Sequence, residues 1–183
     1  MLDAEALIQK HRAKGALVDA NLLVLLLVGG VNKQRIAKFK RTQSFTVEDF
    51  DLLTRLITWF GRLIATPHLL SQASDLTDLH GKELREIRRE FRLIVERIEE
   101  YRDPSRVLVA DPIFERLGLA DAAIATVSSR GILVLTADLD LHLEVRRRGA
   151  DALNFNHIRH LGWNLHRSGC TDDLAAWGFA PPT

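Results

Sequence analysis

The sequence has little sulfur and no long apolar run. Its 183 residues include one cysteine, Cys170, which excludes an internal disulfide and a zinc site made of several thiolates. The longest apolar stretch, residues 22–28, is far shorter than the roughly 20 residues that span a bilayer. Residues 1–14 lack the continuous apolar segment of a signal peptide. We therefore expect a cytoplasmic protein with no membrane partner.

An excess of charge of either sign is also lacking. Lysine and arginine total 25 against 24 aspartates and glutamates, so the net charge of +1 gives no general attraction for nucleic acid. Any contact of that kind must depend on a local basic patch. Hydrophobic residues make up 46% of the chain, which is enough for one core of ordinary size. We expect a single domain over residues 1–183.

Aspartates are present where apolar runs end. Asp19, Asp121 and Asp138 each come directly after a run of apolar or small residues, and Asp140 stands two residues beyond the last of them. An ionised carboxylate beside a packed core costs on the order of several kcal/mol unless it is paired, and carboxylates brought together repel one another. A divalent cation would remove both costs. If the segments converge, the pattern predicts a Mg²⁺ or Mn²⁺ site of oxygen ligands, a type used in phosphodiester hydrolysis.

Apolar periodicity predicts strands that alternate with helices. Strands are expected over residues 16–19, 62–66, 132–136 and 151–155. Helices are expected over residues 22–28, from 46, from 67, and over 82–101, 112–117, 121–128 and 139–148. This alternation indicates an α/β fold with a mainly parallel sheet. Because ligands of such sheets bind beyond the carboxyl ends of the strands, Asp19 and Asp138 are expected at that edge.

Local signals set the expected helix ends. Asn21 is placed to cap the first helix, and Gly29-Gly30 is expected to stop it. Residues 46–49 have the spacing of a capping box, and Pro67 suits a first helical turn. Asp103-Pro104 is expected to end the long amphipathic helix.

Four short stretches, taken in order, resemble a known family. They are residues 17–21, 66–70, 119–123 and 133–141, and the last, with Thr136-Ala137-Asp138 inside it, is the most specific. Together they make residues 16–159 resemble the PIN domain, a three-layer α/β/α fold of metal-dependent nucleases. The resemblance implies a core over about 16–160, a helical insertion over about 31–60 and a C-terminal tail over about 161–183.

The resemblance also implies a site and a reaction. The reaction is endonucleolytic hydrolysis of RNA phosphodiester bonds with Mg²⁺ or Mn²⁺, which lowers the pKa of a bound water and neutralises phosphate charge. Asp19, Asp121 and Asp138 would be catalytic residues and metal ligands, and Asp140 a further ligand. Each acid taken alone also fits a plain role in helix capping or an Asx turn.

The supporting residues leave more than one function open. Asn21 and Thr136 could orient the acids or a water, although capping and turn formation explain them equally well. The family usually has glutamate where this chain has Gln72, and an amide supplies no charge and accepts no proton. Asp75, three residues further on the same helix face, could replace it or could be a solvated residue. The alternative to an active nuclease is a PIN-like RNA-binding or scaffold protein with weakened or lost catalysis.

Partners follow from the same resemblance. The chain could be a VapC-like toxin neutralised by an antitoxin protein, and the apolar face of residues 82–101 could bind a second copy of the chain or an antitoxin instead of packing on the chain's own core.

The haloacid-dehalogenase-type phosphatases are a different enzyme class with some likeness to this sequence, because Asp19 and Thr66 end predicted strands. That chemistry needs a second aspartate where this chain has Asn21.

The basic segment over residues 33–41 is the candidate for RNA contact. Its cations could neutralise phosphates while Phe39 stacks on a base, although a solvated helix face explains them as well. The triplet 146–148 could also contact RNA, although its place near the end of a helix, where the dipole favours cations, explains it as well. His157 and His160 have a spacing that can bind zinc, but no third ligand is evident nearby. The candidate RNA-binding cations are Lys33, Arg35, Lys38, Lys40 and Arg41.

Overall fold

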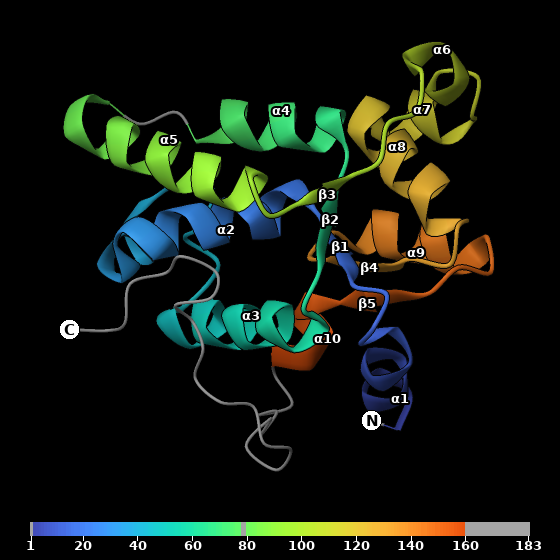
Figure 1. Ribbon diagram of the computed structural model, residues 1–183, viewed down its shortest axis with the longest axis horizontal. Helices are drawn as coiled ribbons and strands as arrows, with labels where there is room; N and C mark the ends of the chain where they lie inside the picture. The colour runs from blue at the N-terminus through green and yellow to red at the C-terminus, as the bar shows by residue number, and fades with distance from the viewer. Residues whose placement is uncertain (1, 78–79, 160–183) are drawn as a thin grey trace.

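A central sheet of five parallel strands organises the molecule. The computed structural model describes residues 2–77 and 80–159 (Figure 1). The strands lie in the order β3-β2-β1-β4-β5, and all four neighbouring pairs are parallel. Leu17 of the central strand lies opposite Ile64 on one side and Val134 on the other. The strands are β1 (Ala16–Val18), β2 (Leu63–Ala65), β3 (Glu99–Glu100), β4 (Leu133–Thr136) and β5 (Ala152–Asn154).

Helices flank the sheet and give three layers, as expected for an α/β/α fold. Figure 1 shows α2, α4 and α5 together on one side of the molecule and α8 with α9 on the other. None of the helices in the described part of the chain has both the length and the apolar content that a bilayer crossing needs. The helices are α1 (Leu2–His11), α2 (Ala20–Val31), the 3₁₀ helix η1 (Lys33–Lys38), α3 (Val47–Phe60), α4 (Pro67–Leu76), α5 (Gly81–Val95), α6 (Ser105–Leu108), α7 (Ile113–Leu117), α8 (Leu119–Ser128), α9 (Leu139–Arg147) and α10 (Phe155–Arg159).

The chain reverses its path across the sheet between β1 and β4. The first three strands proceed outward from β1 through β2 to β3, and the chain then returns to place β4 on the other side of β1. In open α/β sheets, such a switch point forms a crevice beyond the carboxyl ends of the strands. Asp19 directly follows β1, and Asp138 follows β4 by two residues. Both aspartates therefore border this crevice.

Helix α2 begins earlier and ends later than its sequence predicts. The cap is Asp19, whose side chain accepts a hydrogen bond from the Leu22 amide, and the predicted cap Asn21 is an exposed residue of the first turn. The predicted stop at Gly29-Gly30 is wrong, because the helix continues to Val31. Gly29 instead permits close packing, since a Cβ there would lie 2.2 Å from Cδ2 of Phe50 in α3.

The predicted helix over residues 82–101 is wrong at its carboxyl end. Helix α5 stops at Val95, and Glu99 and Glu100 form the edge strand β3, paired with Ile64 and Ala65. Apolar spacing continues to Tyr101 because the residues after the turn still pack against the core from a strand. Asp103-Pro104 consequently follows a strand and does not end a helix.

Other local signals are confirmed. Thr46 and Asp49 form the capping box of α3, and Pro67 occupies the first turn of α4 after the cap Thr66. Helix α8 begins at Leu119, two residues before its predicted start, after Gly118 with φ of +94°. Helices α1 and α6 were not predicted. The expectations for Cys170, His160 and the tail over 161–183 concern residues outside the described part of the chain.

Candidate active site

Asp19 is a buried carboxylate at the end of the central strand. Only 3% of its surface is exposed. Its Oδ1 accepts a hydrogen bond of 2.8 Å from the Leu22 amide, and its Oδ2 accepts one of 2.8 Å from the Ala137 amide and another from the Thr136 hydroxyl. Burial raises the pKa of Asp19, while the hydrogen bonds from Thr136, Leu22 and Ala137 oppose that shift. The side chain is thus fixed in orientation by donors from two segments.

Thr136 connects the ends of β1 and β4. Its side chain is fully buried, and its hydroxyl donates to Oδ2 of Asp19 while accepting a hydrogen bond of 2.9 Å from the Asp138 amide. The hydroxyl therefore orders one carboxylate and the backbone of another. This arrangement supports the predicted orienting role of Thr136 and also fulfils the turn role that was its alternative.

Asp138 is exposed and caps helix α9. Its Oδ1 accepts hydrogen bonds of 2.8 Å from the Asp140 amide and 3.1 Å from the Leu141 amide. Asp140 is exposed in the first turn of α9 and contacts Asp138 through its backbone amide. The Asx-type turn considered for this segment is present. It uses one oxygen of Asp138 and leaves the carboxylate at the surface of the crevice.

Asp121 lies in the first turn of α8 and shares an electrostatic field with the other two acids. Its pKa is raised to about 7, first by burial and then by the negative charges of Asp138 and Asp19. The charge of Asp138 likewise raises the pKa of Asp19. The negative charge of Asp138 thus acts on both Asp19 and Asp121 at one edge of the sheet.

The donor set has the chemistry of a site for a hard cation, without a preformed cluster. No three Asp, Glu, His or Cys side chains among residues 2–77 and 80–159 are arranged so that they could hold a metal ion. Asp19 nevertheless keeps one lone pair on Oδ1, and the charges of all three aspartates are mutually unfavourable. Mg²⁺ and Mn²⁺ prefer carboxylate oxygen ligands, so Asp19, Asp121 and Asp138 would be the residues that hold such an ion.

The two residues considered for the usual glutamate position are both on α4. Gln72 and Asp75 are exposed. Asp75 lines a cleft between α4 and α5 together with Arg88 and Phe91. The cleft lies at the opposite end of α4 from Pro67, which begins the helix beside the sheet edge.

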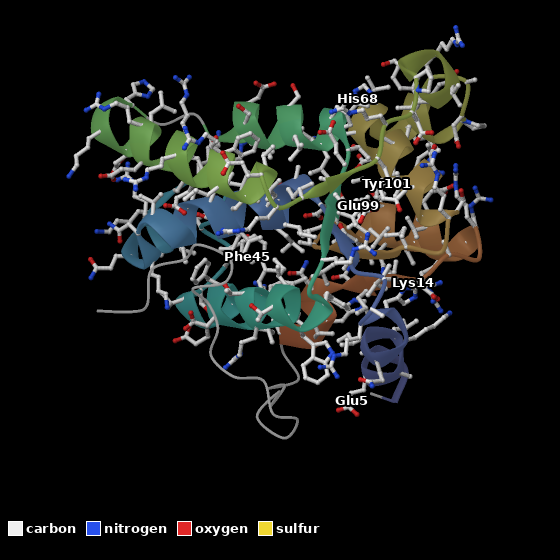
Figure 2. The ribbon with its side chains drawn as sticks, in the orientation of Figure 1. Glu5, Lys14, Phe45, His68, Glu99 and Tyr101 are labelled. Atoms are coloured by element: carbon white, nitrogen blue, oxygen red, sulfur yellow. The ribbon has the colours of Figure 1, made fainter. Side chains whose placement is uncertain are left out.

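A residue that the sequence interpretation left out also orders this edge. Asn156 in α10 donates a hydrogen bond of 2.8 Å to the carbonyl of Ala137, and its own amide is bound by Asn154 at the end of β5. His68, labelled in Figure 2, lies in the first turn of α4, and its Nε2 is 3.5 Å from the hydroxyl of Ser105 in α6. The only sequence signal for Asn156 was its position just after a predicted strand.

An ionic cluster joins the helix before Asp121 to the helix after Asp138. Glu144 of α9 is buried, and Arg116 of α7 donates to it at 3.0 Å. Arg147 and Arg148 donate to the same carboxylate at 2.6 and 2.8 Å. Arg148 also donates to both oxygens of Asp111, which lies two residues before α7, at 2.6 and 2.7 Å. Two of the three arginines in the triplet 146–148 therefore serve this cluster, which we call the α7–α9 clamp.

The predicted RNA-binding cations fall into two groups. Lys33 lies 2.7 Å from Asp51 and over the ring of Phe50, and Arg35 lies 2.5 Å from Glu83. Their charges are compensated within the chain. Lys38, Lys40 and Arg41 are exposed. Of the two groups, only the second has side-chain charges that no acid in the described part of the chain neutralises, and phosphate contact requires such charges.

No family model, curated protein or solved structure matches the chain. The PIN resemblance therefore stays a prediction carried by its four motifs. The phosphatase alternative lacks its second aspartate, because the position two residues after Asp19 holds Asn21, an amide exposed in the first turn of α2.

Proposed function

We propose that the protein is a Mg²⁺- or Mn²⁺-dependent ribonuclease of PIN type, with Asp19, Asp121 and Asp138 as its acidic site. The observation that carries the proposal is geometric: Thr136 joins the carboxylate of Asp19, after β1, to the backbone of Asp138, after β4, and the charges of both aspartates act on Asp121 in α8. Folding keeps three repelling carboxylates at a sheet edge where α/β proteins bind ligands. A cation is the simplest ligand that turns this repulsion into attraction.

Each of the three aspartates has a different part in the proposed site. The metal, when bound, would lower the pKa of a water molecule and neutralise charge on the phosphate. Asp19 is held rigidly by Thr136 and two backbone amides, so its free lone pair points in one direction. Asp138 presents an oxygen that α9 does not need for its cap. Asp121 adds the third carboxylate from the first turn of α8.

The test is metal-dependent cleavage of a mixed RNA pool by protein purified in parallel as wild type and Asp138→Asn. We expect cleavage with Mg²⁺ or Mn²⁺ and a loss of at least about 100-fold in the variant, because removing the charge of one ligand weakens both binding and catalysis. Asp51→Asn, on α3 and paired with Lys33, is the matched control for an aspartate-to-asparagine change elsewhere. Cleavage that is equal in wild type and Asp138→Asn, or absent from folded wild type, would refute the proposal.

A second candidate function is RNA binding with weak or lost catalysis. It is favoured by Gln72, an exposed amide where the family usually has a carboxylate. Gln72→Glu separates the two functions: if the site is active but one charge short, cleavage should increase with that substitution. An antitoxin partner, a homodimer and a cytoplasmic location stay predictions of the resemblance and of composition.

A further inference from the structure

Helix α5 carries a basic stripe that the sequence interpretation did not assign. Its apolar face packs inward through the buried Ile87 and Ile94 and the half-buried Leu84 and Phe91. The opposite side holds four arginines at spacings of three and four residues, which places them in one row on the helix surface. All four are exposed, and they are Arg85, Arg88, Arg89 and Arg92.

Most of this row is not neutralised. Among the described residues, Arg85, Arg88 and Arg89 have no ion-pair partner, whereas Arg92 lies 3.3 Å from Glu96. Glu90 is half-buried, and the charge of Arg89 acts on it without a direct contact. The row thus differs from Lys33 and Arg35, whose charges are paired with acids. Exposed guanidinium groups without partners are suited to a polyanion.

A polar stripe on α4 leads from the acidic site to this row. His68, Ser71, Gln72 and Asp75 recur at helical spacing on the side of α4 that is exposed or half-buried. Ten residues of helix cover about 15 Å, so the stripe begins beside the sheet edge and ends at α5. Gln72 makes the middle of the stripe uncharged, and Asp75 is its single acid.

The two helices meet at a cleft of about 280 Å³. Arg88 and Asp75 line it with the aromatic ring of Phe91 and the hydroxyl-bearing Ser74. Figure 1 shows α4 and α5 lying alongside one another above α2. A cleft that combines a guanidinium, an aromatic ring and a hydroxyl can contact both the phosphate and the base of a nucleotide.

We propose that the arginine row of α5, with the polar stripe of α4, binds the phosphodiester backbone of a single-stranded RNA whose neighbouring segment reaches Asp19, Asp121 and Asp138. This inference rests on the proposed function for the identity of the nucleic acid. A membrane surface is disfavoured as the occupant, because an interfacial helix must offer an apolar face and that of α5 faces the core. The large exposed hydrophobic residues in the described part of the chain lie on α6, on α9 and just after α6, not on α5.

The test measures binding and not cleavage, in the Asp138→Asn background so that the RNA stays intact. Anisotropy of a short fluorescein-labelled oligouridylate is followed between about 50 and 200 mM KCl. Arg85→Gln/Arg88→Gln/Arg89→Gln should weaken binding at least about tenfold and reduce the slope of log Kd against log salt by about 2, since three phosphate contacts on a single strand are lost. Restoring charge with three lysines should recover most of the affinity.

A second triple variant, Lys38→Gln/Lys40→Gln/Arg41→Gln, removes the same charge from the basic segment predicted from the sequence. We expect it to weaken binding less than the α5 variant does. Equal weakening by both variants would mean that only net charge matters, and an unchanged affinity in the α5 variant would overturn the proposal. If the triple variant is unstable, Arg89→Gln alone should still weaken binding and should reduce the salt slope by about 0.7, the share of one phosphate contact.

Two further binding experiments distinguish single-stranded RNA from the other possible ligands of the arginine row. Oligothymidylate of the same length reports whether the row distinguishes RNA from DNA, and flotation with vesicles rich in anionic lipid tests the membrane surface directly. Vesicle binding without RNA binding would refute the proposal. The proposed nuclease function fails independently, because cleavage by wild type and its loss in Asp138→Asn are measured without any change in α5.

Discussion

At the scale of single residues, Thr136 is the side chain on which the acidic edge most depends. Replacing it with valine keeps the shape but leaves Oδ2 of Asp19 short of a donor and the Asp138 amide without an acceptor. We expect Thr136→Val to lower the free energy of unfolding by about 1–3 kcal/mol. Urea unfolding followed by circular dichroism measures the change.

Thr136→Ser is the matched control, because it keeps the hydroxyl and loses only a methyl group. It should retain most of the stability that valine loses. If serine and valine are equally destabilising, then packing of the methyl group and not the hydrogen bonds explains the position.

Asp121 should make stability depend on pH with a definite sign. Its pKa is about 7 in the folded protein and about 3.9 in an unfolded chain, so the folded state holds the proton more tightly between those values. Its contribution to stability is therefore complete below about pH 4 and is lost as the pH rises through 7. After allowance for partial contact with solvent, the loss should be about 2 kcal/mol.

The measurement compares wild type with Asp121→Asn by urea unfolding from pH 4 to pH 8 in metal-free buffer. The neutral amide cannot be repelled by Asp19 and Asp138, so the variant should gain stability relative to wild type as the pH rises. A difference between the two proteins that stays constant over this range would show that the three carboxylates do not act on one another.

At the scale of elements, the α7–α9 clamp joins the helix that precedes α8 and Asp121 to the helix that Asp138 caps. Glu144→Gln would leave Arg116, Arg147 and Arg148 without their shared carboxylate. Because Arg116 and Arg147 are more than half exposed, we expect a loss of roughly 1–3 kcal/mol, below that of a fully buried pair. Faster hydrogen exchange of α7 amides should accompany it.

The clamp also has a pH signature opposite to that of Asp121. Its arginines lower the pKa of Glu144 to about 2, and Arg148 lowers that of Asp111 to about 2. The stabilisation is present above the ordinary carboxyl range near pH 4 and is lost as the pH falls towards 2. Wild type should therefore lose its advantage over Glu144→Gln in acid, and a difference that persists at pH 2 would argue against the ion pairs as its source.

Elements with strong local signals could be predicted from the sequence, and elements decided by tertiary pairing could not. The capping box at Thr46 and the strand before Asp138 depend on nearby residues, and both are found. The edge strand β3 has no strand periodicity of its own and exists because β2 offers it hydrogen bonds. The continuation of α2 through Gly29 depends on the ring of Phe50, which no local pattern reveals.

At the scale of the whole molecule, the candidate acids could be identified from the sequence while their supports could not. Asp19, Asp121 and Asp138 stand out because charge interrupts an apolar run. Asn156 binds the carbonyl of Ala137, 19 positions away, and Glu144 binds Arg116, 28 positions away, and no helix or strand period indicates either separation. The arginine row of α5 was present in the printed sequence, but its lack of partners became evident only in three dimensions.

Metal binding should stabilise the entire fold. An ion that binds only the folded state at about 100 times its Kd adds about 2.7 kcal/mol, which corresponds to roughly 5–10 °C in Tm for a chain of this size. We expect Mn²⁺ to raise Tm in wild type, EDTA to reverse the increase, and Asp138→Asn to abolish it. A Tm that does not respond to Mn²⁺ in wild type would speak against a site for this cation.

The bond between Thr136 and Asp19 joins residues separated by 117 positions along the chain. During synthesis, Asp19 leaves the ribosome long before β4 exists to supply its hydroxyl and amide donors. A nascent chain, or a fragment cut off before residue 133, thus holds the first acid without the geometry that makes it useful. The acidic edge is therefore complete only once β4 and the turn that follows it have been made.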